Sequence, residues 1–404
     1  AVVKRCKCHL SRLLTLEFLF NPSGNPSGAL ALTRCECQQR TSKEPAIVSQ
    51  GMREENLHRL RSPAAQLSLW PATKEAKMLR AVLFSVCFCL PTLARADACG
   101  GQNLFHTMAT AELDSLRDAA AAHPFPEGLH WRATKGARTL TFFGSYHLPH
   151  ALTEAHLERL LPLAEAADVT YFEMDAADTQ RFERAVQQEP DMMFASQGPT
   201  LPELLTPAEW ASVQSKMQAR GFPGFLTAKM KPFFVSMMLG MSPCKLRLMQ
   251  SGELGIDRAL AQALAAEGLP TRSIEDYRTA AKLFDAFSPE KQIELLRLSL
   301  LELVNPDDMM ETLYQSYIAE EIALIWAYTK ALSLQTGGPS AADDFALFEK
   351  LLLTDRNAAW LAELAAAPEN TMLVVVGAAH LSGEAGLLNL LAAEGYTITR
   401  LPLN

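Results

Sequence analysis

The spacing of apolar residues predicts strands near the start of the globular part of the chain. β-branched and aromatic residues flank a Lys135-Gly136 turn signal, which predicts a hairpin of two strands at residues 130–133 and 139–143. Leucines at helical spacing then predict a helix over residues 154–168, and the apolar run at 169–172 predicts a buried strand. Strand, helix and strand therefore follow one another.

The middle and the end of the chain complete this pattern. Five helices are expected in the middle, at residues 207–220, 256–267, 277–303, 307–334 and 341–366. Such runs of Ala, Leu, Glu and Met are difficult to build as sheet. The closing segment predicts a buried strand at 372–376, a helix at about 384–394 and a last strand at 396–401. We therefore expect an α/β fold with a central mixed sheet and a large helical layer from the middle of the chain.

Two segments share one design, a strand, a Gly-x-x-His turn, a helix and a second strand. The first turn is Gly144 to His147 and the second is Gly377 to His380. A glycine after a buried strand permits a sharp exit, and a histidine three residues later projects over the end of the strand. Because ligands of open α/β sheets bind at the carboxyl ends of the strands, we expect both imidazoles to face one crevice.

Two imidazoles at a crevice suggest a metal site. Neutral imidazole is the commonest protein ligand for divalent transition metals, and a catalytic site usually adds a carboxylate. Glu173, at the end of the strand 169–172, is the expected carboxylate, with Asp175 in reserve. The alternative for either histidine alone is a hydrogen-bonded structural residue. No His-Glu-x-x-His, Gly-x-Ser-x-Gly, P-loop or Gly-x-Gly-x-x-Gly motif offers competing chemistry.

The first 96 residues differ from the rest. Residues 78–96 combine Arg80, an apolar run and Ala94-Arg95-Ala96, the pattern of a secretory signal peptide. The alternative is a membrane anchor, but the run is too short for a stable spanning helix. Since a signal peptide begins a precursor, we interpret residues 1–77 as a non-native upstream extension, with a long Arg-rich presequence as the alternative. We expect one α/β domain over residues 97–404 in a periplasmic or secreted protein, cleaved near Ala96.

The net charge limits the classes of binding partner, and the cysteine content suggests a disulfide. Residues 97–404 hold 23 Lys and Arg against 39 Asp and Glu, a net charge of −16. This charge disfavours nucleic acid as the partner and favours a peptide, a small molecule or a metal. We expect no membrane span in this part. Of the eight cysteines only Cys99 and Cys244 lie in it, and in an oxidising compartment they suggest one disulfide, with two free thiols as the alternative.

Several further motifs resemble the TraB/GumN family. They are Phe172-Glu173-Met174-Asp175, Lys231-Pro232-Phe233, Gly255-Ile256-Asp257, Asp355-Arg356-Asn357 with Trp360, and the terminal VVVGAAHLSGEAGLLNLLAAEGYTITRL. That family is similar to the Tiki proteins, which are regarded as metal-dependent proteases, and is grouped more loosely with erythromycin esterases and haem-binding ChaN proteins. Ser145 stands in the first turn where the family usually has Thr, so the hydroxyl is retained.

The resemblance implies roles for particular residues. It marks His147, Glu173 and His380 as metal or catalytic positions, Arg356 as a site arginine that binds a substrate carboxylate or stabilises an oxyanion, and Glu275 as a base or a supporting acid. The alternatives are a helix-surface salt bridge for Arg356, for example to Asp355, and a solvated acid for Glu275.

Our leading hypothesis is an exported metal-dependent hydrolase that cleaves peptide or amide bonds. A divalent metal would lower the pKa of bound water and polarise the carbonyl, and manganese, cobalt or zinc would suit the ligands. The alternative is a non-catalytic envelope protein that binds haem, a metal or a peptide. A weaker possibility, assistance to polysaccharide export or conjugation, rests on the family's name.

Overall fold

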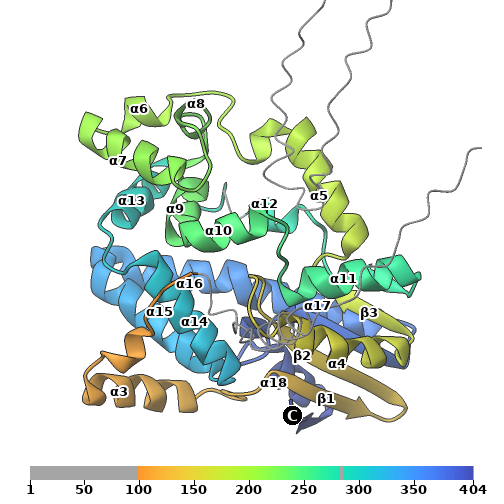
Figure 1. Cartoon of the computed structure of the whole chain (residues 1–404). Coiled ribbons are helices and arrows are strands. Elements are labelled where there is room, and N and C mark those ends of the chain that lie inside the picture. Colours follow the sequence, from red (N-terminus) through yellow and green to blue (C-terminus); the bar gives the residue numbers. More distant parts are fainter. Residues whose placement is uncertain (1–98, 283–284, 404) are drawn as a thin grey trace, which may run out of the picture. The chain divides into compact units, whose positions relative to one another are not determined.

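A computed structural model describes residues 99–282 and 285–403 (Figure 1). The expectations for residues 1–77 and for the signal peptide at 78–96 concern residues outside this range. The strands are β1 (His130–Lys135), β2 (Arg138–Ser145), β3 (Val169–Phe172), β4 (Thr271–Ser273), β5 (Thr371–Gly377) and β6 (Thr397–Arg400).

The helices of the described residues fall into two groups. Those before β4 are α3 (Thr110–Ala121), α4 (Thr153–Glu165), α5 (Ala176–Gln188), α6 (Leu201–Leu204), α7 (Pro207–Gln218), α8 (Gly224–Thr227), α9 (Pro232–Gly240), α10 (Pro243–Gln250) and α11 (Ile256–Glu267). Those after β4 are α12 (Thr279–Lys282), α13 (Pro289–Leu300), α14 (Pro306–Ile318), α15 (Ile322–Thr336), α16 (Ala341–Glu349), α17 (Asp355–Ala366) and α18 (Leu387–Ala393).

The strands form one mixed sheet in the order β4-β3-β5-β2-β1-β6. The neighbours β4, β3, β5 and β2 are parallel, whereas β1 pairs antiparallel with both β2 and β6. The expected α/β fold with a mixed sheet is therefore confirmed. In the register of β2 and β5, Gly144 lies opposite Val376 and Ser145 opposite Gly377, so the two Gly-x-x-His turns leave the sheet side by side.

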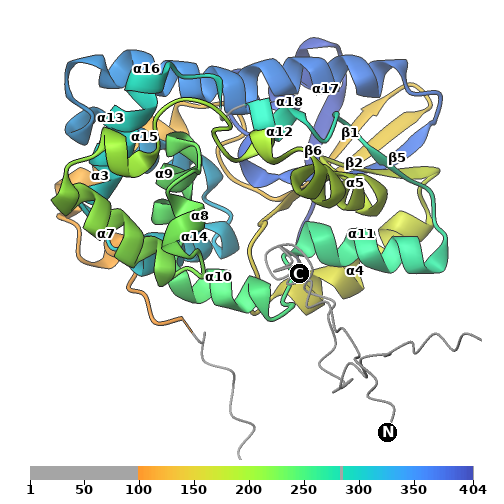
Figure 2. The ribbon, with the colours of Figure 1, turned by 90° about the horizontal axis from the view of Figure 1, so that it is seen from above.

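Both faces of the sheet are buried. Phe142 packs with Trp360 in one core, on the side of α17 and α18. Phe143 and Phe172 pack with Leu160 and Ile256 in another core, on the side of α4 and α11. Figure 2 shows α17 on one side of the sheet and α4 with α11 on the other. Burial of both faces explains why the central strands are continuous apolar runs rather than alternating ones.

The expected helical layer lies beside the sheet, where α7, α9 and α13 enclose a core of their own (Figure 2). Two of the single helices expected there are each broken in two. Over residues 277–303, α13 starts anew at Pro289, because the side chain of Ser288 caps it by accepting a hydrogen bond from the Lys291 amide. Over residues 307–334, α14 and α15 are separated by a turn with Glu320 at φ 61°.

The disulfide between Cys99 and Cys244 is present, with the two Cα atoms 5.5 Å apart. This bond links the segment that precedes α3 to helix α10. Two hydrogen bonds hold the same segment on α14, from the Gln102 amide to Asp308 and from the Leu104 amide to Thr312. The expectation of one disulfide from two cysteines is confirmed.

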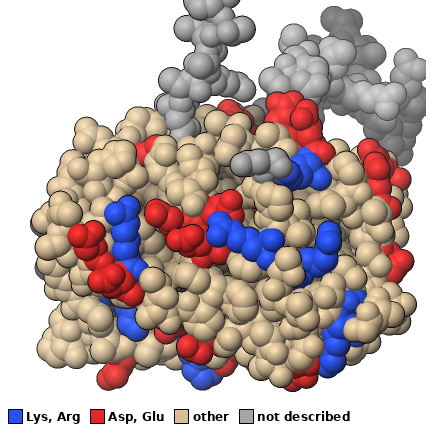
Figure 3. Space-filling view, turned by 90° about the horizontal axis from the view of Figure 1, so that it is seen from below, with Lys and Arg blue, Asp and Glu red and all other residues tan. Residues whose placement is uncertain are grey.

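The surface gives no sign of a single charged patch on the face drawn in Figure 3, where acidic and basic side chains lie interspersed among neutral ones. Within residues 99–282 and 285–403, no helix combines the length and apolarity needed to cross a bilayer.

Candidate functional site

The four neighbouring parallel strands each deliver one candidate side chain at the same edge of the sheet. Glu275 follows β4, Glu173 follows β3, His380 ends the turn after β5, and His147 follows β2. Since the carboxyl ends of parallel strands meet at one edge, residues separated by up to 233 positions become neighbours.

Glu173 stands between the two imidazoles. Its Oε1 atom lies 3.7 Å from His147 Nε2 and 3.9 Å from His380 Nε2. The Gly377 amide donates a hydrogen bond of 2.7 Å to the same oxygen. A Cβ at position 377 would lie only 3.0 Å from His147 Nε2 and 3.1 Å from Glu173 Oε1, so a side chain there would displace one or both of these groups.

Asp257 orients His147. The Nδ1 atom of His147 lies 3.2 Å from Asp257 Oδ2, in the first turn of α11, which directs Nε2 towards Glu173. Asp257 is therefore brought to the site, whereas Asp175, the reserve acid, caps α5 by accepting from the Asp178 amide.

Arg356, at the start of α17, donates through all five of its N–H groups. Two reach Glu275, from Nε at 3.0 Å and from Nη2 at 2.7 Å, and Nη2 also reaches Glu173 Oε2 at 2.6 Å. Nη1 donates to the Leu352 carbonyl at 3.1 Å and to His380 Nε2 at 3.2 Å. This guanidinium thus holds the two acids and one histidine in place.

The surroundings of Arg356 bear on both of its expected roles. Its side chain is only 10% exposed and its partners are Glu173 and Glu275, so the alternative of a helix-surface salt bridge is wrong, and Asp355 pairs with Lys350 instead. Because every donor is already used, binding of a substrate carboxylate or an oxyanion would first require one of these bonds to break. That role stays a prediction.

His380 is held by two residues that belong to one of the family motifs but were given no role from the sequence. Its Nδ1 lies 2.6 Å from Asn357 Oδ1, and the Asn357 amide donates to the carbonyls of His380 and Ala385. The ring lies 4.2 Å from the Trp360 ring, whose Nε1 donates to Glu275 Oε2. Because Asn357 Oδ1 accepts a hydrogen bond, the proton of the neutral ring lies on Nδ1. The other ring nitrogen, Nε2, therefore carries the lone pair that accepts from Arg356.

The charges of the site follow from these contacts. Burial lowers the pKa of His380 to about 3, so this ring is neutral at physiological pH. Burial also opposes charge on His147, but Asp257 and Glu173 outweigh it and raise the pKa to about 9. The side chain of His147 is 55% exposed, so water screens part of this attraction. Burial raises the pKa of Glu173, but the charges of His147 and Arg356 and the Gly377 amide outweigh it and lower the pKa to about 2.

A divalent ion would find suitable donor types in His147, Glu173 and His380, which converge on one point. Arg356 competes for that point, since it occupies His380 Nε2 and one oxygen of Glu173. Within residues 99–282 and 285–403, no three His, Cys, Asp or Glu side chains are arranged as a ready-made ion site. The donor set fits a metal in type, and Arg356 would have to release His380 for that ring to bind one.

A comparison with protein families matches residues 129–400 to the TraB/PrgY/gumN family. The chain belongs to the TraB/PrgY/gumN family. The region matched to TraB/PrgY/gumN begins one residue before β1 and ends with β6, so it includes the whole sheet and every site residue described above. A comparison with curated proteins gives no match. The family resemblance expected from the motifs is confirmed.

Two cavities of this TraB/PrgY/gumN chain meet at Ser145 and His147. One, of about 260 Å³, extends past Glu173 and Asp257 towards α5. The other, of about 410 Å³, extends past Gly377 and His380 and is lined almost entirely by apolar groups. The candidate residues therefore border both cavities.

Proposed function

We propose that this chain is a hydrolase that cleaves peptide or amide bonds at the edge of the sheet where Glu173 lies between His147 and His380. The observation that carries the proposal is the convergence of both imidazole Nε2 atoms within 4 Å of one carboxylate oxygen, from three adjacent parallel strands. A paired acid and base beside two cavities supports hydrolysis of a substrate that binds in them.

The protonation states suggest which residue would act as the base and which as the acid. With its raised pKa, His147 is protonated at neutral pH, whereas Glu173 is ionised. Glu173 would accept a proton from the attacking water as oxygen bonds to the carbonyl carbon. When the carbon–nitrogen bond breaks, the leaving nitrogen would take the proton from His147 Nε2. Transfer of one proton from Glu173 to His147 then restores the site.

A divalent ion is part of the proposal. His147, Glu173 and His380 would hold it, and when bound it would supply a Lewis acid for the carbonyl and lower the pKa of water. Because a nitrogen that binds a metal carries no proton, His147 Nε2 would donate a proton to the leaving nitrogen only in the metal-free site. Manganese, cobalt and zinc are all compatible with two imidazoles and a carboxylate. We also propose that the protein acts in the periplasm or outside the cell, and the Cys99–Cys244 disulfide supports this, since such bonds persist in oxidising compartments.

Peptide hydrolysis tests the proposal. The full chain is stripped with a chelator, reloaded with manganese, cobalt or zinc, and incubated with a peptide library whose products are identified by mass spectrometry. We expect cleavage that falls at least about 100-fold in His147→Ala, Glu173→Gln and His380→Ala, the usual size of an acid–base contribution.

The matched control for this experiment is His106→Ala, an exposed histidine away from the site, which is expected to retain full activity. Cleavage of no peptide under any metal condition, or equal activity in the control and in all three site variants, would contradict the proposed function.

A further inference from the structure

The larger of the two cavities is an apolar space, partly open to solvent, with candidate catalytic groups in its wall. We define the apolar chamber as this cavity of about 410 Å³, whose walls include Tyr146, Leu313, Ile325, Trp326, Leu352 and His380. Its volume falls within the range of small-molecule sites, about 300 to 1,000 Å³. Ser145, His147 and Arg356 line it as well, so the chamber borders the candidate site.

One polar atom of the chamber awaits a partner. Ser145 is only 3% exposed, and its Oγ makes no hydrogen bond to any residue that the structure describes. It lies in the wall of both cavities, directly before the His147 turn. The Oγ atom itself has almost no accessible surface, so a ligand would reach it only after a neighbouring side chain shifts. Since a buried hydroxyl without a partner is costly, such a contact with a hydrogen-bonding group, for example the backbone of a peptide, would be favourable.

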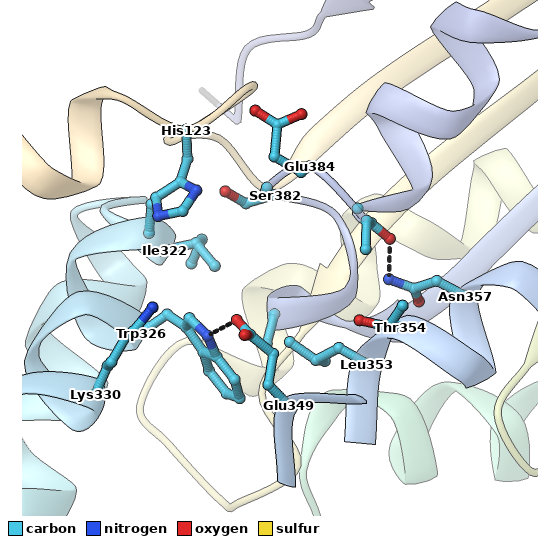
Figure 4. A pocket seen from close by; sticks show the side chains of 15 residues that line it. His123, Ile322, Trp326, Lys330, Glu349, Leu353, Thr354, Asn357, Ser382 and Glu384 are labelled. Atoms are coloured by element: carbon cyan, nitrogen blue, oxygen red, sulfur yellow. Dashed lines mark hydrogen bonds between the residues drawn. The ribbon is translucent and has the colours of Figure 1, made fainter. Parts of the chain in front are cut away.

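Trp326 lines both the apolar chamber and a neighbouring cavity. Its indole Nε1 donates to Glu349 Oε1 at 2.7 Å, and its ring packs on Phe345 at 5.5 Å. Beyond it lies a second cavity of about 280 Å³, which shares Ile322, Trp326, Leu353 and Ala379 with the chamber. Figure 4 shows this second cavity, with the Trp326–Glu349 hydrogen bond across its floor and the polar groups of His123, Lys330 and Ser382 around it. The indole therefore belongs to the wall that the two cavities share, and its contacts with Glu349 and Phe345 hold it there.

We propose that the apolar chamber binds an apolar side chain of the substrate next to the bond that is cleaved, and that Trp326 limits the size of that side chain. The inference rests on the proposed function for the identity of the cleaved bond, and on the cavity alone for binding. The substrate class it names is a peptide with a large apolar residue beside the scissile amide, anchored at its backbone by Ser145.

Cleavage profiling tests the role of Trp326. Peptides that differ only in one residue beside the cleaved bond, with leucine, phenylalanine or naphthylalanine there, are digested by the wild-type chain and by Trp326→Ala. Removal of the indole joins the two cavities, so we expect the preference for naphthylalanine over leucine to rise at least about 10-fold, the size of effect that a small change of pocket volume produces. Should Trp326→Ala fail to fold, Trp326→Phe keeps the contact with Phe345 and is expected to give a smaller shift in the same direction.

Binding of a fluorescent probe separates the chamber from catalysis. N-phenyl-1-naphthylamine, a neutral apolar probe, is titrated into the full chain, and we expect saturable binding at one site. Leu313→Gln places an amide in the chamber wall and is expected to weaken binding at least about 10-fold. Leu334→Gln is the matched control, because Leu334 is an exposed leucine that does not line the chamber, and it is expected to leave binding unchanged.

The two experiments fail in different ways. Probe binding that is lost in Leu313→Gln, without cleavage of any peptide, would support the chamber and overturn the proposed function. Cleavage without preference for apolar residues, together with no saturable probe binding, would overturn the chamber and leave the proposed function standing. An unchanged size preference in both Trp326 variants would overturn the role of Trp326.

Discussion

Replacement of Arg356 by methionine is the perturbation whose outcome the structure determines most closely. The side chain is nearly equal in length but uncharged, so Glu173 and Glu275 lose their shared counter-charge while the space stays filled. The side chains involved are 10%, 18% and 9% exposed. Removal of one partner from a buried ion pair costs about 3 to 5 kcal/mol, because it leaves a charge without compensation. We expect a loss of that size in the free energy of unfolding at pH 7.5.

The pH dependence of this loss has a definite sign. In the wild type the pKa of Glu173 is about 2, below the unfolded value of about 4.3, so its contribution of roughly 3 kcal/mol is complete above pH 4.3 and disappears as the pH falls towards 2. Without the guanidinium, the pKa of Glu173 rises, and its protonation relieves the unpaired charge. The difference between wild type and Arg356→Met should therefore be smaller at pH 5 than at pH 7.5.

Urea unfolding followed by tryptophan fluorescence measures this difference at the two pH values. The control is Arg278→Met, which removes an ion pair of similar length, 2.7 Å to Glu189, between side chains that are 48% and 50% exposed. Such exposed pairs contribute less than about 1 kcal/mol. A loss in Arg356→Met no larger than in the control, or one that stays constant between pH 7.5 and pH 5, would refute the reasoning.

Three further substitutions test other parts of the account. Gly377→Ala places a methyl group 3.0 Å from His147 Nε2, so we expect hydrolysis to fall at least about 10-fold while the urea midpoint stays close to that of the wild type. Asn357→Ala removes three hydrogen bonds around His380 and should cost roughly 2 to 4 kcal/mol in urea unfolding; a loss under 1 kcal/mol would contradict the contacts. Replacement of both Cys99 and Cys244 by serine should cost about 2 to 5 kcal/mol, and reduction of the wild type should produce the same urea midpoint as the double variant.

Local sequence patterns were sufficient to predict the site residues that directly follow a strand. The Gly-x-x-His turns and Glu173 each follow a buried strand, and the strand ends could be located from the apolar runs alone. Ser288-Pro289 was also a local signal, a cap followed by proline at the first helical position, and it could have divided the helix expected over residues 277–303.

The remaining features depend on contacts between distant residues. Nothing near β2 or β3 indicates that β5 lies between them, because strand order is set by packing across the whole domain. The residue type of Arg356 allowed several roles, and only the three-dimensional arrangement shows that all five donors are used. Asn357 stands beside Arg356 in a family motif, but its role could not be predicted, because its hydrogen bond to His380 joins residues 23 positions apart.

The central claim is that His147 and His380 belong to one functional centre, and a double-variant cycle of amide hydrolysis tests it most directly. The values of kcat/KM are measured for the wild type, His147→Ala, His380→Ala and the double variant on one cleaved peptide. Residues that act as a unit are not additive, so we expect the double variant to be no slower than the slower single variant. Losses that multiply, as for independent sites, would contradict the claim.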